Sequence, residues 1–239
     1  MHVPSLTGIP PQNEKDFLMR LYLFVGFTLA LFVAPASALP PSNEKTLEHA
    51  AEVLDELTKI PLKGIPAALL ADAQGVAIIP RVIKAGFVVG GRGGHGFVMT
   101  KDKDGTWGDP VFVDLGGASV GFQVGVVSTD VVLVFRNRKS LDRLMEGKGK
   151  VTLGADAAVA AGPVGRMVAA ATDGKLEAEI LSYSRSRGLF AGVSLDGAAI
   201  HANADSNAMF RKPGQTVEKK LADGVKVRLV EMSKEKPAP

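Results

Sequence analysis

Short β-rich runs that follow one another closely between residues 76 and 135 constrain the fold of this chain more than any other feature. Glycine, aspartate and lysine separate the runs, and such residues are typical of turns. Strands this close in sequence pair through short connections, whereas parallel strands need long crossovers. We therefore expect a largely antiparallel sheet or barrel. The runs span residues 76–80, 87–89, 97–100, 111–115, 119–127 and 131–135.

The run 119–127 has the clearest alternation, which is the period of a strand with two different faces. One face carries Val120, Phe122, Val124 and Val126, and the other carries Ser119, Gly121, Gln123 and Gly125. The second face is almost without side chains, so we expect another part of the backbone to pack closely on it.

Helices are predicted on both sides of this β-rich region. Ser42 or Asn43 can cap an amphipathic helix that runs to Lys59, with an apolar face and an acidic opposite face. A short helix should begin at Pro66, and residues 139–146 should form another. Together with the strands, these helices predict an α+β fold in which helices cover the sheet.

The first 38 residues have the composition of a secretory signal peptide. Arg20 precedes an uncharged apolar run, 21–34, and Ala36-Ser37-Ala38 offers a cleavage site after Ala38. Met19 is an alternative start of translation, since residues 1–18 are unusually polar for such a leader. The sequence therefore predicts an exported protein that is periplasmic or associated with the cell envelope. The chain has no cysteine, so burial alone must hold its core.

The segment 91–96 matches the G-x-G-x-x-G pattern of dinucleotide-binding sites. In those sites a helix follows the glycines, so that its N-terminus meets the pyrophosphate. Here the predicted strand 97–100 follows instead. We interpret the segment as a glycine-rich hairpin turn and expect no nucleotide cofactor.

Residues 117–121 match the G-x-S-x-G pattern of hydrolases, with Ser119 as the nucleophile. That pattern also requires a strand-to-helix turn and a histidine base, whereas Ser119 opens an alternating strand. A hydrolase therefore stays a third alternative, which needs His95 or His201 beside Ser119. Three scattered histidines after residue 38 and no cysteine predict no transition-metal site.

A first basic feature lies between residues 136 and 150. Arg136, Arg138 and Lys139 begin it, and only Asp142 and Glu146 oppose its positive charge. Arginine grips phosphate through two parallel hydrogen bonds, which suits a lipid headgroup. The alternative is an ordinary solvated surface.

A second basic feature lies in the segment 182–188. Strand alternation places Tyr183, Arg185 and Arg187 on one face. An amphipathic aromatic ring beside two guanidinium groups suits a membrane interface. Equally, the arginines can pair with acidic residues and hold the sheet together; the candidate partners are Glu177, Glu179 and Asp196.

A series of ordered motifs is similar to the SYLF domain family. They include GVAIIP at 75–80, LGGASVG at 115–121 and YSRSRGLFAGVS at 183–194, with further blocks at 84–87, 128–130, 135–138, 153–156 and 161–165. The resemblance covers residues 43–212 and leaves 213–239 as a charged tail. It implies binding to phosphoinositides and other acidic phospholipids, and in fungal members association with actin filaments.

The sequence as a whole predicts a non-enzymatic, lipid-binding module without cofactor, metal or nucleic-acid partner. The expected ligand is an anionic phospholipid or membrane surface, with headgroup contacts from Tyr183, Arg185, Arg187, Arg136, Arg138 and Lys139. Actin enters only by family analogy, because an exported protein would not meet it. The rival hypothesis is a structural or interaction protein of the cell envelope, with self-association in place of lipid specificity.

Overall fold

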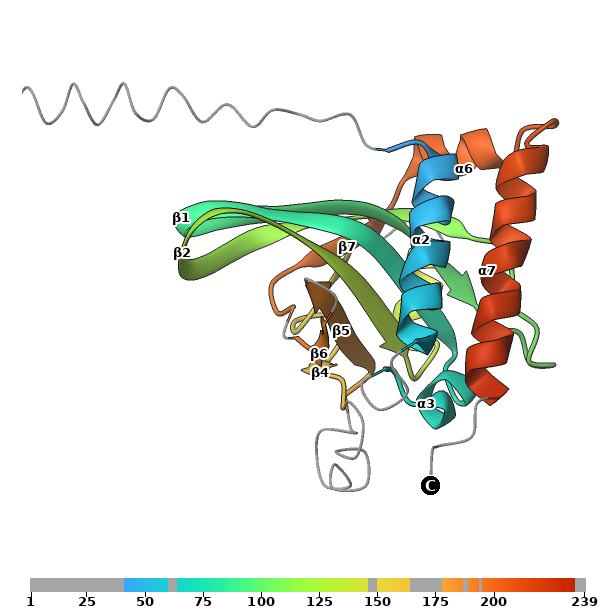
Figure 1. Cartoon of the computed structure of the whole chain (residues 1–239), viewed down its shortest axis with the longest axis horizontal. Helices are drawn as coiled ribbons and strands as arrows, with labels where there is room; N and C mark the ends of the chain where they lie inside the picture. Colours follow the sequence, from blue (N-terminus) through green and yellow to red (C-terminus); the bar gives the residue numbers. More distant parts are fainter. Residues whose placement is uncertain are drawn as a thin grey trace, which may run out of the picture. The chain divides into compact units, whose positions relative to one another are not determined.

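The computed structural model describes residues 41–59, 64–145, 150–163, 178–186, 189–193 and 195–234. They belong to one unit that begins at Pro40. The predicted signal peptide, residues 1–38, lies outside these ranges. Within them the predicted α+β fold is confirmed: a curled, mostly antiparallel sheet carries helices on its outer side (Figure 1).

Two long strands dominate the sheet. Strand β1 (Gly75–Thr100) pairs antiparallel with β2 (Val111–Phe135), from Gly75 opposite Phe135 to Val98 opposite Val111. The six short strands predicted from the sequence are therefore segments of two continuous ones. The glycine-rich segment 91–96 lies inside β1 and is not a hairpin turn, which corrects the prediction; the chain reverses between residues 101 and 110.

The glycines of β1 allow this strand to fold back on itself. A Cβ atom at Gly96 would lie 2.7 Å from Cα of Ile79, and one at Gly94 would lie 2.8 Å from Cγ2 of Val82. The segments 75–86 and 90–100 therefore pack on each other at a distance that only glycine permits. The hairpin bends between them, which gives the sheet the curl visible in Figure 1.

Shorter strands complete the sheet on both arms of the hairpin. β7 (Ala199–Ala202) pairs with the first part of β2, and β3 (Lys150–Thr152) pairs with β7. β5 (Ile180–Ser186) pairs with the last part of β2, and it is joined by the parallel β4 (Val159–Ala161) and the antiparallel β6 (Leu189–Gly192). The inner side of the curl is a core that includes Ile79, Leu133 and Ile200 and is closed by helix α4 (Lys139–Met145).

Helices α2 (Asn43–Thr58), α3 (Ala67–Ala71) and α7 (Thr216–Lys234) form a second core on the outer side of the sheet. The predicted amphipathic helix is confirmed as α2: the Ser42 side chain accepts a hydrogen bond from the Lys45 amide, and Leu47 and Leu54 are buried. Among the helices in the described ranges, none is both long and apolar enough to cross a membrane.

The segment predicted as a charged tail is part of this second core. Val225 and Leu229 of α7 are buried in the same cluster as Leu54 of α2. Arg228 of α7 also donates hydrogen bonds to both carboxylate oxygens of Asp55, at 2.6 and 2.9 Å. The domain therefore continues past Lys212 to the end of α7.

One side chain of helix α6 (Ala204–Phe210) forms hydrogen bonds with the backbone of β2, as a neighbouring strand would do. Asn207 accepts a hydrogen bond from the Phe112 amide at 2.8 Å and donates one to the Phe112 carbonyl at 2.9 Å. These two bonds satisfy buried backbone groups at the start of β2, and so they fix α6 to the sheet.

Candidate functional site

Arg185 lies in an ion cluster between the sheet and helix α2. The strand register places it opposite Asp130, and its Nε and Nη2 atoms lie 2.7 and 2.6 Å from Oδ2 of that carboxylate. Its Nη1 atom also pairs with Glu56 of α2. Ion pairing was the predicted alternative to lipid contact for Arg185, but the expected partners were other carboxylates.

A β-bulge in β1 supports the other side of Asp130. Arg81 sits in the bulge between Ile79 and Val82, with a φ of 52°, and its amide donates to Oδ1 of Asp130 at 2.9 Å. A non-glycine residue in this backbone region is strained and persists only where its surroundings hold it. Burial raises the pKa of Asp130, and the Arg81 amide opposes that rise only in part.

A cleft of about 400 Å³ opens beside this cluster. Its walls are His49, Glu52, Val53, Glu56, Arg81, Ser128, Asp130 and Arg185. The three carboxylates outnumber the two guanidinium groups, so an anion that entered the cleft would meet net repulsion. The cluster is therefore better suited to fastening α2 to the sheet than to holding a phosphate.

Tyr183 is completely buried, which corrects the expectation that it meets a membrane interface. Alternation does place Tyr183 and Arg185 on the same face of β5, as predicted. That face, however, belongs to the core under α2 and α7, where the Tyr183 hydroxyl donates to the Pro163 carbonyl at 3.3 Å. Burial raises its pKa. Arg187 lies outside the described residues.

Arg136, Arg138 and Lys139 form what we call the basic turn, which leads from the end of β2 into the first residue of α4. Arg136 and Lys139 are exposed and Arg138 is half-buried. The backbone of the turn is held in place, because the Arg136 amide donates to the Glu179 carbonyl at 2.9 Å. Across the ranges that the structure describes, none of the three side chains forms an ion pair with a carboxylate.

The structure separates the two groups of predicted lipid-binding residues. Arg185 is opposite Asp130, whereas the basic turn begins after Phe135, which is opposite Ile180. Five residues of extended strand span about 17 Å. The ion cluster and the basic turn are therefore two different places on the molecule.

The hydrolase alternative required a histidine beside Ser119, and the register of the sheet separates them. Ser119 is opposite Gly90, while His95 and His201 are both opposite Asp114, five residues along β2. That spacing again corresponds to about 17 Å. The backbone therefore holds position 119 away from both of the histidines that the sequence offered as bases.

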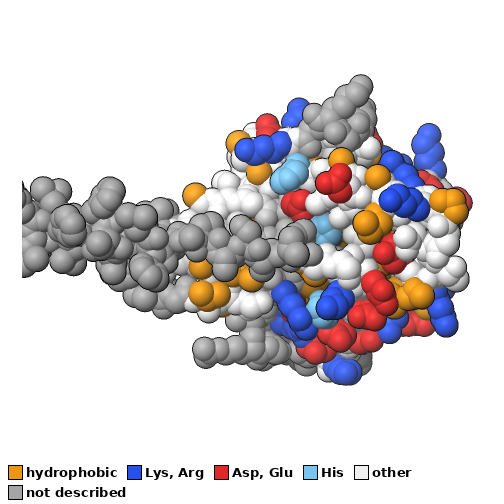
Figure 2. All heavy atoms as spheres, turned by 90° about the horizontal axis from the view of Figure 1, so that it is seen from above, with side chains coloured by type: hydrophobic (Ala, Val, Ile, Leu, Met, Phe, Trp, Pro, Cys, Tyr) orange, Lys and Arg blue, Asp and Glu red, His pale blue; other side chains and the backbone are white. Residues whose placement is uncertain are grey.

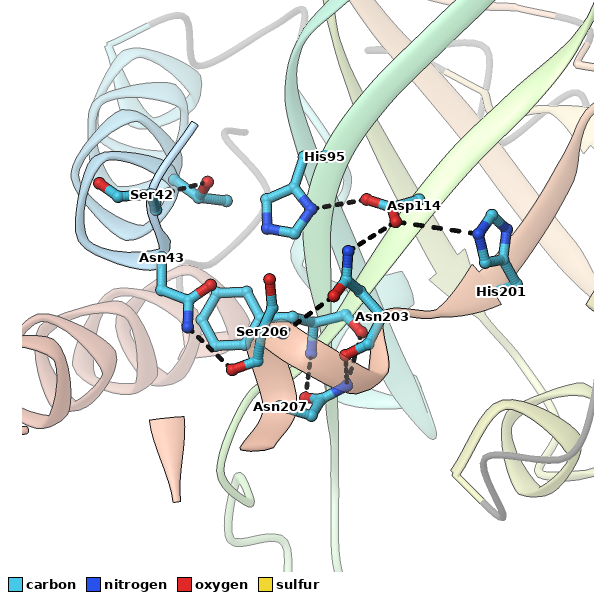
Figure 3. Close-up of polar contacts among 10 residues, drawn as sticks. Ser42, Asn43, His95, Asp114, His201, Asn203, Ser206 and Asn207 are labelled. Atoms are coloured by element: carbon cyan, nitrogen blue, oxygen red, sulfur yellow. Dashed lines mark hydrogen bonds and ion pairs between the residues drawn. The ribbon is translucent and has the colours of Figure 1, made fainter. Parts of the chain in front are cut away.

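Asp114 is instead the centre of a structural polar network (Figure 3). Its carboxylate lies 2.6 Å from Nδ1 of His95, accepts a hydrogen bond from Asn203 at 2.7 Å, and lies 3.8 Å from Nε2 of His201. Burial opposes ionisation, but these partners together lower the pKa of Asp114. Asn203 also caps α6 by accepting from the Ser206 amide. The network thus ties β1, β2, β7 and α6 together.

Sequence reasoning missed Asp114, Asp130 and Asn207, which hold much of this architecture. Alternation along a strand tells which residues share a face, but it does not tell which strand will lie beside them. Among the described residues, no group of three or more histidine, aspartate or glutamate side chains could hold a metal ion.

Comparison with known proteins identifies relatives of the chain. A family model described as "Ysc84: Las17-binding protein actin regulator" matches residues 116–234. The human SH3 domain-containing YSC84-like protein 1 is 39% identical over 176 residues, which cover 71% of this chain and 51% of the relative. Protein YSC84 of Saccharomyces cerevisiae is 38% identical over 197 residues, which cover 79% of this chain and 42% of the relative. No solved structure matches the chain.

These relatives overturn the prediction of export. The chain spans about half the length of the animal relatives that it matches. The animal and yeast relatives are eukaryotic proteins, and the family is described as an actin regulator. Actin is found inside cells. The predicted periplasmic or cell-envelope location, with cleavage after Ala38, is therefore wrong. A hydrophobic run near the start of a chain is a composition signal, and composition alone does not identify a secreted protein.

The family description names binding and actin regulation, and the names of the human and yeast relatives do not describe an enzyme. The motif series and the matches to animal and yeast relatives agree with each other. The chain belongs to the Ysc84, or SYLF, family.

Proposed function

We propose that the chain is a non-catalytic binding module that recognises anionic phospholipid through the basic turn. The observation that carries this proposal is the presence of three cationic side chains in one turn without an ion-pair partner in the described structure. Arginine at two of the three positions suits phosphate, because its planar guanidinium group can donate two parallel hydrogen bonds.

The expected strength follows from the number of charges. A cation close to an anionic bilayer contributes about 1 kcal/mol, so three contribute about 3 kcal/mol, or roughly a hundredfold in affinity. This attraction acts through water and is screened by salt. Arg187 stays a predicted headgroup contact. Arg185 forms ion pairs with Asp130 and Glu56, so its main role is to stabilise the fold and not to contact lipid.

Liposome sedimentation tests this proposal. The protein is mixed with vesicles of phosphatidylcholine alone or with phosphatidylserine, at low and high salt. Binding should require the anionic lipid and weaken with salt. The variant Arg136→Gln/Arg138→Gln/Lys139→Gln should lose most of it.

A matched control removes the same charge elsewhere. Arg211, Lys212 and Lys219 are exposed, and no ion pair joins them to another described residue. Changing all three to glutamine lowers the net charge equally, and this variant should keep most of the binding. An equal loss in both variants would show that net charge, not the basic turn, controls binding. Absence of binding to any anionic vesicle would end the lipid proposal.

A second candidate function is binding to a protein of the actin machinery. The family description names Las17 and actin regulation, and one yeast relative, 40% identical over 148 residues, is named LAS seventeen-binding protein 3. Export had argued against actin as a partner, because an exported protein would not meet it, and that prediction is overturned. Co-sedimentation with actin filaments and pull-down with Las17 would test this function directly. Binding to actin or Las17 without binding to vesicles would replace the lipid proposal.

Sedimentation velocity of the protein alone would test the rival hypothesis of self-association.

A further inference from the structure

One face of β2 passes from the covered core to open solvent. Residues on this face alternate along the strand: Val132 is buried under the outer helices, Asp130 belongs to the ion cluster, and Ser128 and Val126 are exposed. The cover provided by α2 therefore ends at Asp130. The paired strands continue beyond it, as Figure 1 shows for the hairpin that projects away from the helices.

We call the projecting part the hairpin bend and define it as residues 83–92 of β1 and 117–128 of β2, which are opposite each other in the register. Ile83 is 46% exposed, Val126 is 73% exposed and Val127 is 38% exposed. Val126 and Val127 are neighbours in a strand, so their side chains point to opposite faces. Both faces of the ribbon are therefore open to solvent here. Figure 2 shows hydrophobic side chains at this end of the molecule.

The hairpin bend also has an unusual balance of charge. Its two segments contain Lys84 and Arg92 but no aspartate or glutamate. Lys84 is opposite Val127 in the register and is half-buried. A lysine of this kind can keep its ammonium group at a lipid phosphate while neighbouring apolar groups lie deeper. Exposed apolar residues with positive charges and no negative ones are complementary to an anionic bilayer.

We propose that the hairpin bend inserts into the bilayer, with Ile83 and Val126 in the apolar layer and Lys84 at the phosphates. This inference rests on the proposed lipid-binding function and adds the element that enters the membrane. The bend is separate from the basic turn, because residues 126 and 136 lie about 33 Å apart along an extended strand. The turn attracts the surface through charge, whereas the bend binds through apolar burial.

Site-specific labelling tests insertion directly. The chain has no cysteine, so Val126→Cys offers a single thiol for an environment-sensitive fluorophore. Val227→Cys in α7 is the matched control, since Val227 is 56% exposed and lies on the helix layer. With vesicles that contain phosphatidylserine, the emission at position 126 should shift to the blue and be quenched by a quencher on the acyl chains. The label at position 227 should not respond.

Binding measurements with Val126→Glu and Val227→Glu provide a second test. A carboxylate at position 126 would have to enter the apolar layer, so affinity for anionic vesicles should fall by about tenfold or more. The component of the vesicle affinity that persists at high salt should fall most, because it comes from apolar burial. Val227→Glu adds the same charge and should cause a much smaller loss. Circular dichroism of both variants checks that they are folded.

The outcomes separate this inference from the proposed function. Vesicle binding that depends on the basic turn, with no blue shift at position 126 and no effect of Val126→Glu, would refute insertion and leave lipid binding intact. Absence of vesicle binding altogether would refute both. A blue shift at position 126 that grows with protein concentration in the absence of vesicles would show that a second copy covers the bend, and this too would overturn the inference.

Discussion

The guanidinium group of Arg185 and the carboxylate of Asp130 face each other across β5 and β2, with two nitrogen–oxygen distances of 2.7 and 2.6 Å. The Asp130 side chain is only 11% exposed, and the same arginine reaches Glu56 on α2. A charge this close to the core depends on its partner. The contact therefore links the sheet to the helix that covers it.

Arg185→Met should destabilise the protein by about 2–4 kcal/mol, because it leaves Asp130 buried without its counter-charge. Urea unfolding at neutral pH would measure the change. The double variant Arg185→Met/Asp130→Asn should lose less than the single variant, since the charge left at position 56 is largely solvated, the buried one is gone, and the asparagine oxygen can still accept from the Arg81 amide. An equal or larger loss in the double variant would contradict this account of the ion cluster.

Gly96→Ala should prevent the normal fold or destabilise it by about 3 kcal/mol or more, as overpacking against a fixed backbone does. The added methyl group would meet the backbone of Ile78 and Ile79. Gly91→Ala is the control, because a Cβ atom there would have no atom within 4 Å. Thermal unfolding of both variants would show whether the fold-back of β1 needs glycine. Similar losses at both positions would mean that it does not.

Asn207→Ala should cost about 1–3 kcal/mol, because the buried Phe112 amide would lose its hydrogen-bond partner and the Phe112 carbonyl would keep only the bond from the Asn203 amide. Asn207→Asp keeps an acceptor for the amide but loses the donor to the carbonyl, so its stability should be intermediate. Hydrogen exchange at the Phe112 amide offers a local readout. Unchanged protection of this amide in Asn207→Ala would refute the role assigned to Asn207.

Asp55 should make stability depend on pH in the acid range. Its hydrogen bonds with Arg228 lower its pKa in the folded chain, so the folded state favours the ionised form. The resulting stability is present above the unfolded pKa of about 4 and is lost as the pH falls through the folded value. Because Asp55 is 47% exposed, the contribution should be only about 0.5–1 kcal/mol.

Comparison of the wild type with Asp55→Asn measures this contribution. Urea unfolding should show the variant less stable at neutral pH, and the difference should disappear under strongly acid conditions. High salt should also reduce the difference, since the pair is near the surface. A difference that persists unchanged in acid would assign the effect of the substitution to packing.

Local patterns were sufficient for much of the secondary structure. Ser42 and the apolar spacing that includes Leu47 and Leu54 predicted α2, and the helix predicted at residues 139–146 is found as α4. The alternation of Tyr183 with Arg185 was also correct. These signals depend on residues a few positions apart, which is the range over which caps and helix or strand periods act.

The glycine-rich segment 91–96 shows where local patterns fail. Glycine is suited both to a tight turn and to close backbone packing, and the sequence around it is the same in either case. Only the approach of Ile78 and Ile79 to Gly96 decided between them. In the same way, the segment after Lys212 looked like a charged tail until Val225 and Leu229 were seen to share a core with α2.

The amino-acid sequence by itself determined the helix and strand types, the alternating faces and the family. The tertiary structure decided that Tyr183 is buried, that Arg185 pairs with Asp130 and Glu56, and that Arg136 and Lys139 of the basic turn and Ile83 and Val126 of the hairpin bend are exposed. The reason is that burial and ion pairing depend on which distant segments meet. Their meeting is set by the packing of the whole chain around its two cores, not by the residues next to each site.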